Sequence, residues 1–164
     1  MAIFEAERSD NKAASNAIAR KEGFRSYMSQ LGEESKLIYS SYYVESKEKS
    51  RLSVAGFLAE HPDVKGISVL NSRGYLISEI LRDLGRDDIR LISFDLTESN
   101  VRELENGHIT ALLCQRPQQQ GFNAIKALIN HLLYRNHEEY KLHLMPIDVI
   151  FKENLPYYKE IIKD

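Results

Sequence analysis

Short apolar segments alternate with longer segments of helical period along the whole chain, and this alternation constrains the fold more than any other feature. Five such alternations are present. Apolar runs of four to eight residues suit buried strands, whereas apolar residues at i, i+3, i+4 and i+7 suit a helix with one buried face. Strands that alternate with helices form a parallel sheet covered on both faces. The sequence therefore predicts an α/β fold with a doubly wound, mostly parallel sheet.

The expected strands and helices follow from the bounds of these segments. The strands are expected at about 2–7, 36–43, 65–70, 90–94 and 109–113, and a last extended segment at about 142–151. One helix is expected to end near position 31, a second to cover about 50–60, a third to run from 71 to 84, and a fourth to run from Pro117 to Arg135. A short polar helix is expected after position 94. The Pro117 helix carries a long apolar stripe, which consists of Phe122, Ile125, Ile129, Leu132 and Leu133.

Length and charge narrow the class of protein. A chain of 164 residues is the size of one ordinary domain, and its formal net charge of -2 lacks the basic excess that binding to nucleic-acid phosphates requires. The single cysteine, Cys114, cannot form an internal disulfide and is expected to be a buried, inert thiol. No apolar run is long enough to span a bilayer, and the first eight residues carry acids where a signal peptide is apolar. A cytoplasmic location is expected.

The sequence lacks the residue patterns that several kinds of functional site require. The eight glycines are too far apart to form a phosphate-binding loop, and no two of the five histidines have the helical spacing of a metal pair. No nucleophile with an adjacent base stands out. We therefore expect no cofactor, no metal and no catalysed reaction.

Polar and aromatic residues follow the expected strands. Ligands of a doubly wound sheet bind beyond the carboxyl ends of its strands. The residues at those positions are Ser9, Asp10, Tyr42, Tyr43, Asn71, Asp95 and Gln115. Carboxylates and carboxamides hydrogen-bond sugar hydroxyls, and aromatic rings cover the apolar side of a sugar. Each residue also has a structural alternative: Asn71 can cap the next helix, Asp95 can form a turn, and the tyrosines can pack at a strand end.

Five segments together are similar to one known family. The run SNAIARKEGFRSY resembles the "R-x-x-G-F" helix of LacI-type (lactose-repressor-like) transcription regulators and their periplasmic sugar-binding relatives. HPDVKGISVLNSRGYLISEILRDLG resembles the segment with the family's Asn-Asp pair, IRLISFDLTESN resembles its "V-x-G-F-D" strand, and ALLCQRPQQQGFNAIKALI resembles its "Q-x-P-x-x-x-G" helix start. The ending MPIDVIFKENLPYY is more similar to that of the regulators than to that of the transport proteins.

The resemblance implies which residues bind an effector. It assigns Asn71, Asp95 and Gln115, which their strand-end positions also select, and it adds Arg20. Tyr43 completes the candidate set as an aromatic face, although the family's spacing places that face nearer Glu45. Two positions differ from the family, since Ser72 stands where it has Asp and Ser93 where it has Gly.

The resemblance also implies a domain organisation. Residues 1–164 are expected to be the C-terminal lobe of a periplasmic-binding-protein-like effector domain, together with a returning helix and strand of the other lobe. That lobe and a DNA-binding headpiece would precede this chain. The expected protein is a homodimeric regulator that binds a small carbohydrate-like effector, contacts DNA only through the headpiece and has no membrane partner. The alternative is a lobe of a periplasmic sugar-binding protein of a transporter.

Overall fold

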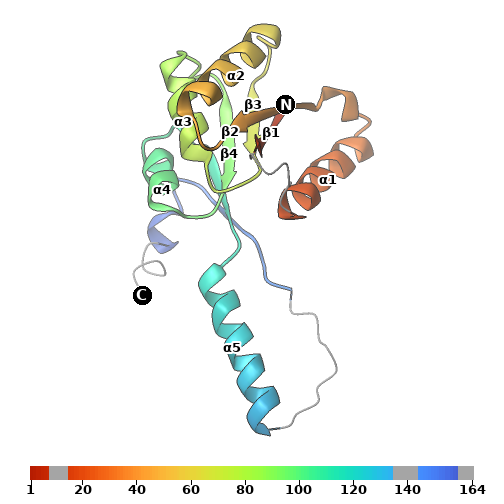
Figure 1. The fold of residues 1–164 in the computed structure, drawn as a ribbon, viewed down its shortest axis with the longest axis vertical. Helices are drawn as coiled ribbons and strands as arrows, with labels where there is room; N and C mark the ends of the chain where they lie inside the picture. The colour runs from red at the N-terminus through yellow and green to blue at the C-terminus, as the bar shows by residue number, and fades with distance from the viewer. Residues whose placement is uncertain (8–14, 135–143, 159–164) are drawn as a thin grey trace.

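The strands form one sheet in the order β2-β1-β3-β4-β5-β6, in a computed structural model that describes residues 1–7, 15–134 and 144–158 (Figure 1). The strands are β1 (Ala2–Glu7), β2 (Ile38–Tyr43), β3 (Gly66–Val69), β4 (Arg90–Phe94), β5 (Ala111–Cys114) and β6 (Asp148–Ile150). The first five strands pair in parallel, and β6 pairs antiparallel with β5. The predicted mostly parallel α/β sheet is confirmed.

Helices cover both faces of this sheet, as the alternation predicts. The covering helices are α1 (Ser15–Gln30), α2 (Lys47–Glu60), α3 (Gly74–Asp83) and α4 (Glu98–Glu105). The structure also has a helix α5 (Pro117–Tyr134) and a short 3-10 turn, η1 (Glu34–Lys36). The larger apolar core joins the sheet to α2, α3 and α4, and a smaller one joins Ile3, Leu70 and Phe94 to residues of α1 on the other face. In Figure 1, α1 accordingly lies across the sheet from α2 and α3.

Most boundaries differ from the sequence prediction by a few residues; for example, α2 begins at Lys47 and not near 50, and β5 covers Ala111–Cys114 and not 109–113. Two further differences have a clear structural reason. Strand β2 begins at Ile38 and not at Lys36, because the preceding residues wind into η1. Helix α3 begins at Gly74 and not at Asn71, which leaves Asn71 in the connection after β3. Gly74 packs directly against β4, where a Cβ atom would clash with the side chain of Ser93. This close approach holds the start of α3 against the end of β4.

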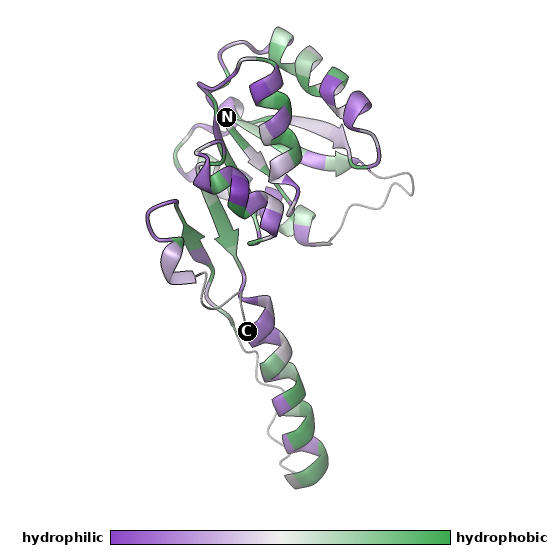
Figure 2. Cartoon of the chain, turned by 90° about the vertical axis from the view of Figure 1, so that its left-hand side faces the viewer, coloured by the Kyte–Doolittle hydropathy of each residue, from purple (hydrophilic) through white to green (hydrophobic). Residues whose placement is uncertain are grey.

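Helix α5 extends away from the sheet instead of covering it (Figure 1). The apolar stripe predicted on this helix is exposed, with 45% of Ile129 and 71% of Leu133 accessible to solvent. Figure 2 shows the hydrophobic colour running along much of the helix. The expected last strand is shorter than predicted, since only Asp148–Ile150 pairs with the sheet and positions 142 and 143 lie outside the described residues.

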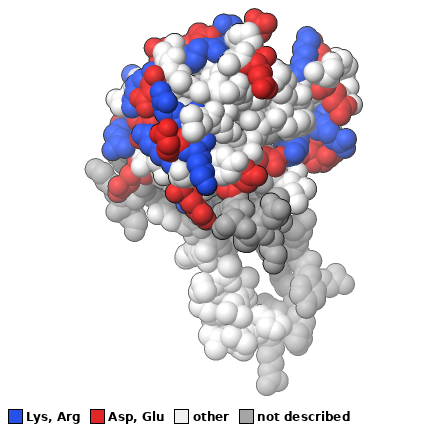
Figure 3. All heavy atoms as spheres, turned by 45° about the horizontal axis from the view of Figure 1, so that its top comes forward, with Lys and Arg blue, Asp and Glu red and all other residues white. Residues whose placement is uncertain are grey.

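Charged side chains of both signs are interspersed over the upper part of the face seen in Figure 3. A surface of this kind does not create the one-sign field that attracts a nucleic-acid backbone. In the part of the chain that the structure describes, no helix is both long and apolar enough to cross a bilayer.

Candidate functional site

The carboxyl edge of the sheet brings together four of the five residues selected from the sequence. Asn71, Asp95 and Gln115 follow β3, β4 and β5, and Arg20 reaches the same edge from α1. Because parallel strands all end at one edge, residues far apart in the chain become neighbours there. Ser9 and Asp10, which follow β1, lie outside the described residues.

Arg20 is anchored by two contacts from neighbouring strands. Its Nη1 donates a 2.6 Å hydrogen bond to the backbone carbonyl of Leu70, and its guanidinium carbon lies 3.7 Å from the centroid of the Phe94 ring. Partial burial lowers the pKa of Arg20, and the nearby Asp95 carboxylate opposes this effect. An arginine keeps its charge under such a shift, so the edge holds one fixed cation beside one carboxylate.

Asn71 is held by its side-chain oxygen. The backbone N–H of Arg73 donates to Asn71 Oδ1 at 2.9 Å, and the hydroxyl of Tyr42 donates to the same oxygen at 2.8 Å. The bond from Arg73 closes a turn just before α3. Asn71 does not cap that helix, because the N-cap position is Arg73 and no side chain caps it. The two hydrogen bonds use only the oxygen of the carboxamide.

Asp95 adopts a left-handed backbone conformation, with φ of 66°. Its N–H donates to the carbonyl of Leu113 at 2.9 Å, so the ladder between β4 and β5 continues to this residue before the chain turns. The turn alternative for Asp95 therefore describes its backbone, while its carboxylate stays at the edge. Gln115 Nε2 reaches Asp95 Oδ1 in a long hydrogen bond of 3.5 Å.

The structure does not bring Tyr43 together with the other four residues. Adjacent strand residues face opposite sides of a sheet. Tyr42 is therefore fully buried in the larger core, whereas 38% of Tyr43 is exposed and its hydroxyl pairs with Glu7, which raises the pKa of the phenol. The alternation along β2 indicates which tyrosine is buried: Ile38 and Tyr42 are an even number of residues apart and share one face of the strand, whereas Tyr43 lies on the other face.

Asn100 is a residue of this edge that sequence reasoning missed. It lies in α4 with no exposed surface, and the two hydrogens of its Nδ2 are shared among the carbonyls of Ser72, Phe94 and Asp95, which lie 2.9 to 3.1 Å away. Its Oδ1 accepts from the N–H of Tyr75 at 2.9 Å. One carboxamide thus ties together the two connections that carry Asn71 and Asp95. An asparagine in a polar helix gives no sequence signal for such a role.

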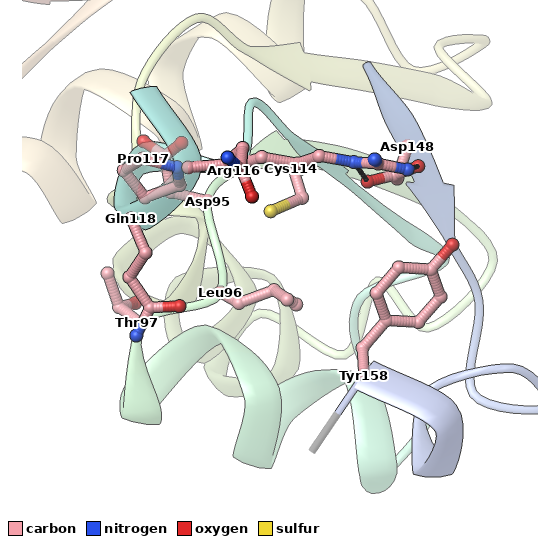
Figure 4. A pocket seen from close by; sticks show the side chains of 10 residues that line it. Asp95, Leu96, Thr97, Cys114, Arg116, Pro117, Gln118, Asp148 and Tyr158 are labelled. Atoms are coloured by element: carbon pink, nitrogen blue, oxygen red, sulfur yellow. Dashed lines mark hydrogen bonds and ion pairs between the residues drawn. The ribbon is translucent and has the colours of Figure 1, made fainter. Parts of the chain in front are cut away.

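A pocket of about 460 Å³ opens on the α4 side of the same edge (Figure 4). Leu96, Cys114 and Tyr158 supply apolar surface, and of the five candidate residues the pocket includes only Asp95. Cys114 is buried as predicted, and burial raises the pKa of its thiol, which keeps it protonated and unreactive at neutral pH.

An ion pair closes one end of this pocket. Arg116, which has φ of 53°, donates from Nε and Nη2 to both carboxylate oxygens of Asp148 at 2.6 and 2.7 Å, and it lowers the pKa of that carboxyl. The pair joins the connection into α5 to the start of β6, as the dashed lines in Figure 4 show. Within residues 1–7, 15–134 and 144–158, no group of three or more His, Cys, Asp or Glu side chains is placed to hold a metal ion.

The comparisons with known proteins identify the family and the fold of this chain. The family described as periplasmic binding protein domain matches residues 2–136. No curated protein sequence matches the chain. A solved structure from Bacteroides fragilis, a provisionally assigned LacI transcriptional regulator, is 34% identical with a TM-score of 0.86, and the match covers 96% of this chain and 54% of that one.

Two transporter proteins share the fold at lower identity. A solute-binding protein from Agrobacterium vitis, bound with α-D-tagatopyranose, is 19% identical with a TM-score of 0.74 and is matched over 94% of this chain and 51% of its own. A solute-binding protein from Burkholderia graminis in complex with D-arabinose is also 19% identical, with a TM-score of 0.75, over 96% of this chain and 54% of its own. This chain therefore spans about half the length of these structures and matches one lobe of their fold.

Proposed function

Because this chain belongs to the family of periplasmic binding protein domains, we propose that it is the C-terminal part of the effector-binding domain of a LacI-type transcription regulator. The observation that carries the proposal is the convergence of Arg20, Asn71, Asp95 and Gln115 at one edge of the sheet. The 34% identity to a provisionally assigned LacI regulator over nearly the whole chain supports the regulator over other members of the fold.

The chemistry of this edge suits a small carbohydrate. A carboxylate accepts two hydroxyl hydrogens, a carboxamide both donates and accepts, and a guanidinium donates in a fixed plane. Asp95, Gln115 and Arg20 provide one group of each kind, and the Arg20 and Asp95 charges compensate one another. A neutral polyhydroxy ligand satisfies such groups without adding a net charge to a partly desolvated cleft.

The second lobe of the site is part of the same proposal. Helix α5 and the segment that leads to β6 belong, in this proposal, to the other lobe, which would cover the apolar stripe of α5. The exposure of that stripe supports this arrangement, as does the half-length match to the structures named above. Closure of two lobes on a sugar would then change the affinity of a headpiece for DNA.

The alternative is a sugar-binding protein of a transporter. It is supported by the sugar-bound transporter proteins that share the fold. The gene sequence upstream of this chain separates the two, because a regulator requires a DNA-binding headpiece there and a transporter protein requires a signal peptide. The regulator would act as a cytoplasmic homodimer and would catalyse no reaction.

A mobility-shift assay tests the proposal. The full-length protein is titrated onto duplex DNA from the region flanking its gene, with and without a neutral sugar that binds it. We expect a salt-sensitive shift that the sugar strengthens or weakens. The chain of residues 1–164, with its net charge of -2, is the control and should shift no DNA. A full-length protein that binds the sugar but shows no DNA binding in any sugar state would contradict the regulator and favour the transporter protein.

A further inference from the structure

Two hydrogen bonds meet at one atom of Asn71, and they define which end of its carboxamide is available. The backbone N–H of Arg73 can only donate, so the atom that it meets at 2.9 Å must be the oxygen, Oδ1. The Tyr42 hydroxyl lies 2.8 Å from the same oxygen and must therefore donate as well. The orientation of this carboxamide thus follows from its neighbours.

The other end of the carboxamide remains for a ligand. Among the residues that the structure describes, none forms a hydrogen bond with Nδ2 of Asn71. As far as the described residues go, both hydrogens of Nδ2 are therefore available at the edge that also carries Asp95 and Arg20. Rotation of the carboxamide by 180° would place Nδ2 against the N–H of Arg73, which is a contact between two donors.

Tyr42 occupies a position from which it can hold this orientation. Its side chain is fully buried in the larger core, so its hydroxyl cannot exchange Asn71 for bulk water. Removal of the hydroxyl would leave Arg73 as the one described donor to Oδ1, and that bond lies in a short turn. A buried phenol that donates to a polar side chain at a binding edge fixes that side chain more firmly than a solvent-exposed partner.

We propose that Tyr42 is a positioning residue for the effector site: it fixes the carboxamide of Asn71 with the nitrogen toward the ligand, so that the site demands an acceptor oxygen from the sugar at this point. This inference rests on the proposed function. Tyr42 does not touch the sugar itself. It acts through Asn71, and its contribution disappears when Asn71 is absent.

A double-mutant cycle in the full-length protein tests the coupling. The probe is whichever of D-arabinose, D-tagatose, D-ribose and D-galactose raises the melting temperature of the unaltered protein most, and calorimetric titration measures its affinity. Tyr42→Phe, which keeps the ring in the core, and Asn71→Ala should each weaken binding roughly tenfold, the effect of one hydrogen bond. The double variant should bind no more weakly than Asn71→Ala alone. Losses that multiply, or an Asn71→Ala variant with unchanged affinity, would overturn the proposal.

Two further variants separate positioning from general damage. Tyr39→Phe removes a hydroxyl from an exposed tyrosine of the same strand and should leave the affinity unchanged. Asn71→Asp keeps the oxygen that accepts from Tyr42 and Arg73 but replaces the ligand-facing donor by an acceptor, so it should weaken sugar binding at least tenfold with little change in melting temperature. Tight binding by Asn71→Asp would show that no donor is required there.

A measurement on the sugar-free protein tests the positioning role of Tyr42 separately from the proposed sugar binding. The side-chain amide signal of Asn71 in a ¹⁵N spectrum, assigned by its loss in Asn71→Ala, should shift in Tyr42→Phe and stay in place in Tyr39→Phe. If none of the four sugars binds, the proposed function fails for this set, and a shifted signal still supports the positioning role. An unshifted signal overturns that role whether or not a sugar binds.

Discussion

The buried side-chain amide of Asn100 donates a 3.1 Å hydrogen bond to the backbone carbonyl of Asp95. The same nitrogen also donates to the carbonyls of Phe94 and Ser72, so α4 holds the ends of both β3 and β4. Asp95 sits in a left-handed conformation that few residues adopt without support. The connection that carries the Asp95 carboxylate is therefore fixed by hydrogen bonds from α4.

Replacement of Asn100 should destabilise the fold. Asn100→Ala would leave three carbonyls and the N–H of Tyr75 without their buried partner, and we expect a loss of about 2 kcal/mol or more in the free energy of unfolding. Asn100→Asp keeps the size and the acceptor but turns a charge toward the carbonyls, so it should cost at least as much. Urea unfolding measures both, with Arg102→Ala at an exposed position of α4 as the control. If the Asn100 variants were as stable as this control, the hydrogen bonds of Asn100 would not be important for the stability of the fold.

Removal of the charge of Asp95 should weaken effector binding. Asp95→Asn is the informative change, because asparagine also tolerates a positive φ and the backbone is preserved. A charged acceptor in a partly desolvated cleft contributes about 2 kcal/mol, so the affinity for a bound sugar should fall roughly thirtyfold. Titration calorimetry on the full-length protein measures it, and Asp87→Asn at an exposed turn is the control. Equal affinities for Asp95→Asn and the unaltered protein would rule out a contact with the sugar.

Local signals in the sequence predicted most of the fold. Gly32 and Gly85 end α1 and α3 with positive φ, and Pro117 begins α5, as their residue types require. The sequence predicts too early a start for α3, because Asn71 resembles a helix cap. Its position depends instead on the fit of Gly74 against Ser93, a contact between residues far apart in the chain.

The sequence predicts only those residues of the candidate site whose position follows from the parallel direction of the strands. Asn71, Asp95 and Gln115 were found because parallel strands end at one edge. Asn100 and Tyr42 form hydrogen bonds to Ser72 and Asn71, which lie 28 and 29 residues away in the chain, and neither bond leaves a local pattern. The ion pair between Arg116 and Asp148 likewise joins positions 32 apart. Such partners depend on packing that a single sequence does not display.

The pair between Arg116 and Asp148 should stabilise the chain in a pH-dependent way. Two charge-assisted hydrogen bonds join the carboxylate of Asp148 to an arginine that is open to solvent, so the pair stabilises the folded chain only modestly at neutral pH. Arg116 lowers the pKa of Asp148 in the folded state. The contribution is therefore complete above the ordinary aspartate pKa of about 3.9 and is lost as the pH falls through the lowered value.

Chemical unfolding of Arg116→Gln across pH 7 to 2.5 measures this effect. The stability difference from the unaltered chain should be constant down to about pH 4 and should shrink below it. Arg90→Gln, at an exposed position of β4, is the control and should show a small difference that varies little with pH. A difference for Arg116→Gln that grows on acidification would have the wrong sign for this pair.

The exposed stripe of α5 should make the chain of residues 1–164 self-associate. Burial of one large aliphatic side chain stabilises by about 1.5–3 kcal/mol, and this helix exposes several of them on one side. Ile129→Glu should shift the chain toward monomer in light scattering. Asn130→Glu adds the same charge to an exposed polar position and should leave association unchanged. A monomeric unaltered chain with α5 still undocked would contradict the proposal that α5 is covered by a second lobe.

A thermal-shift titration of the full-length protein against neutral mono- and oligosaccharides tests the central claim most directly. A ligand that binds only the folded state stabilises it by about 2.7 kcal/mol at a concentration one hundred times its Kd. We predict that at least one neutral sugar raises the melting temperature in a concentration-dependent way, and that Asp95→Asn moves this response to higher sugar concentration. A response that is identical in Asp95→Asn, or the absence of any response across the sugars, would contradict a carbohydrate site at this edge of the sheet.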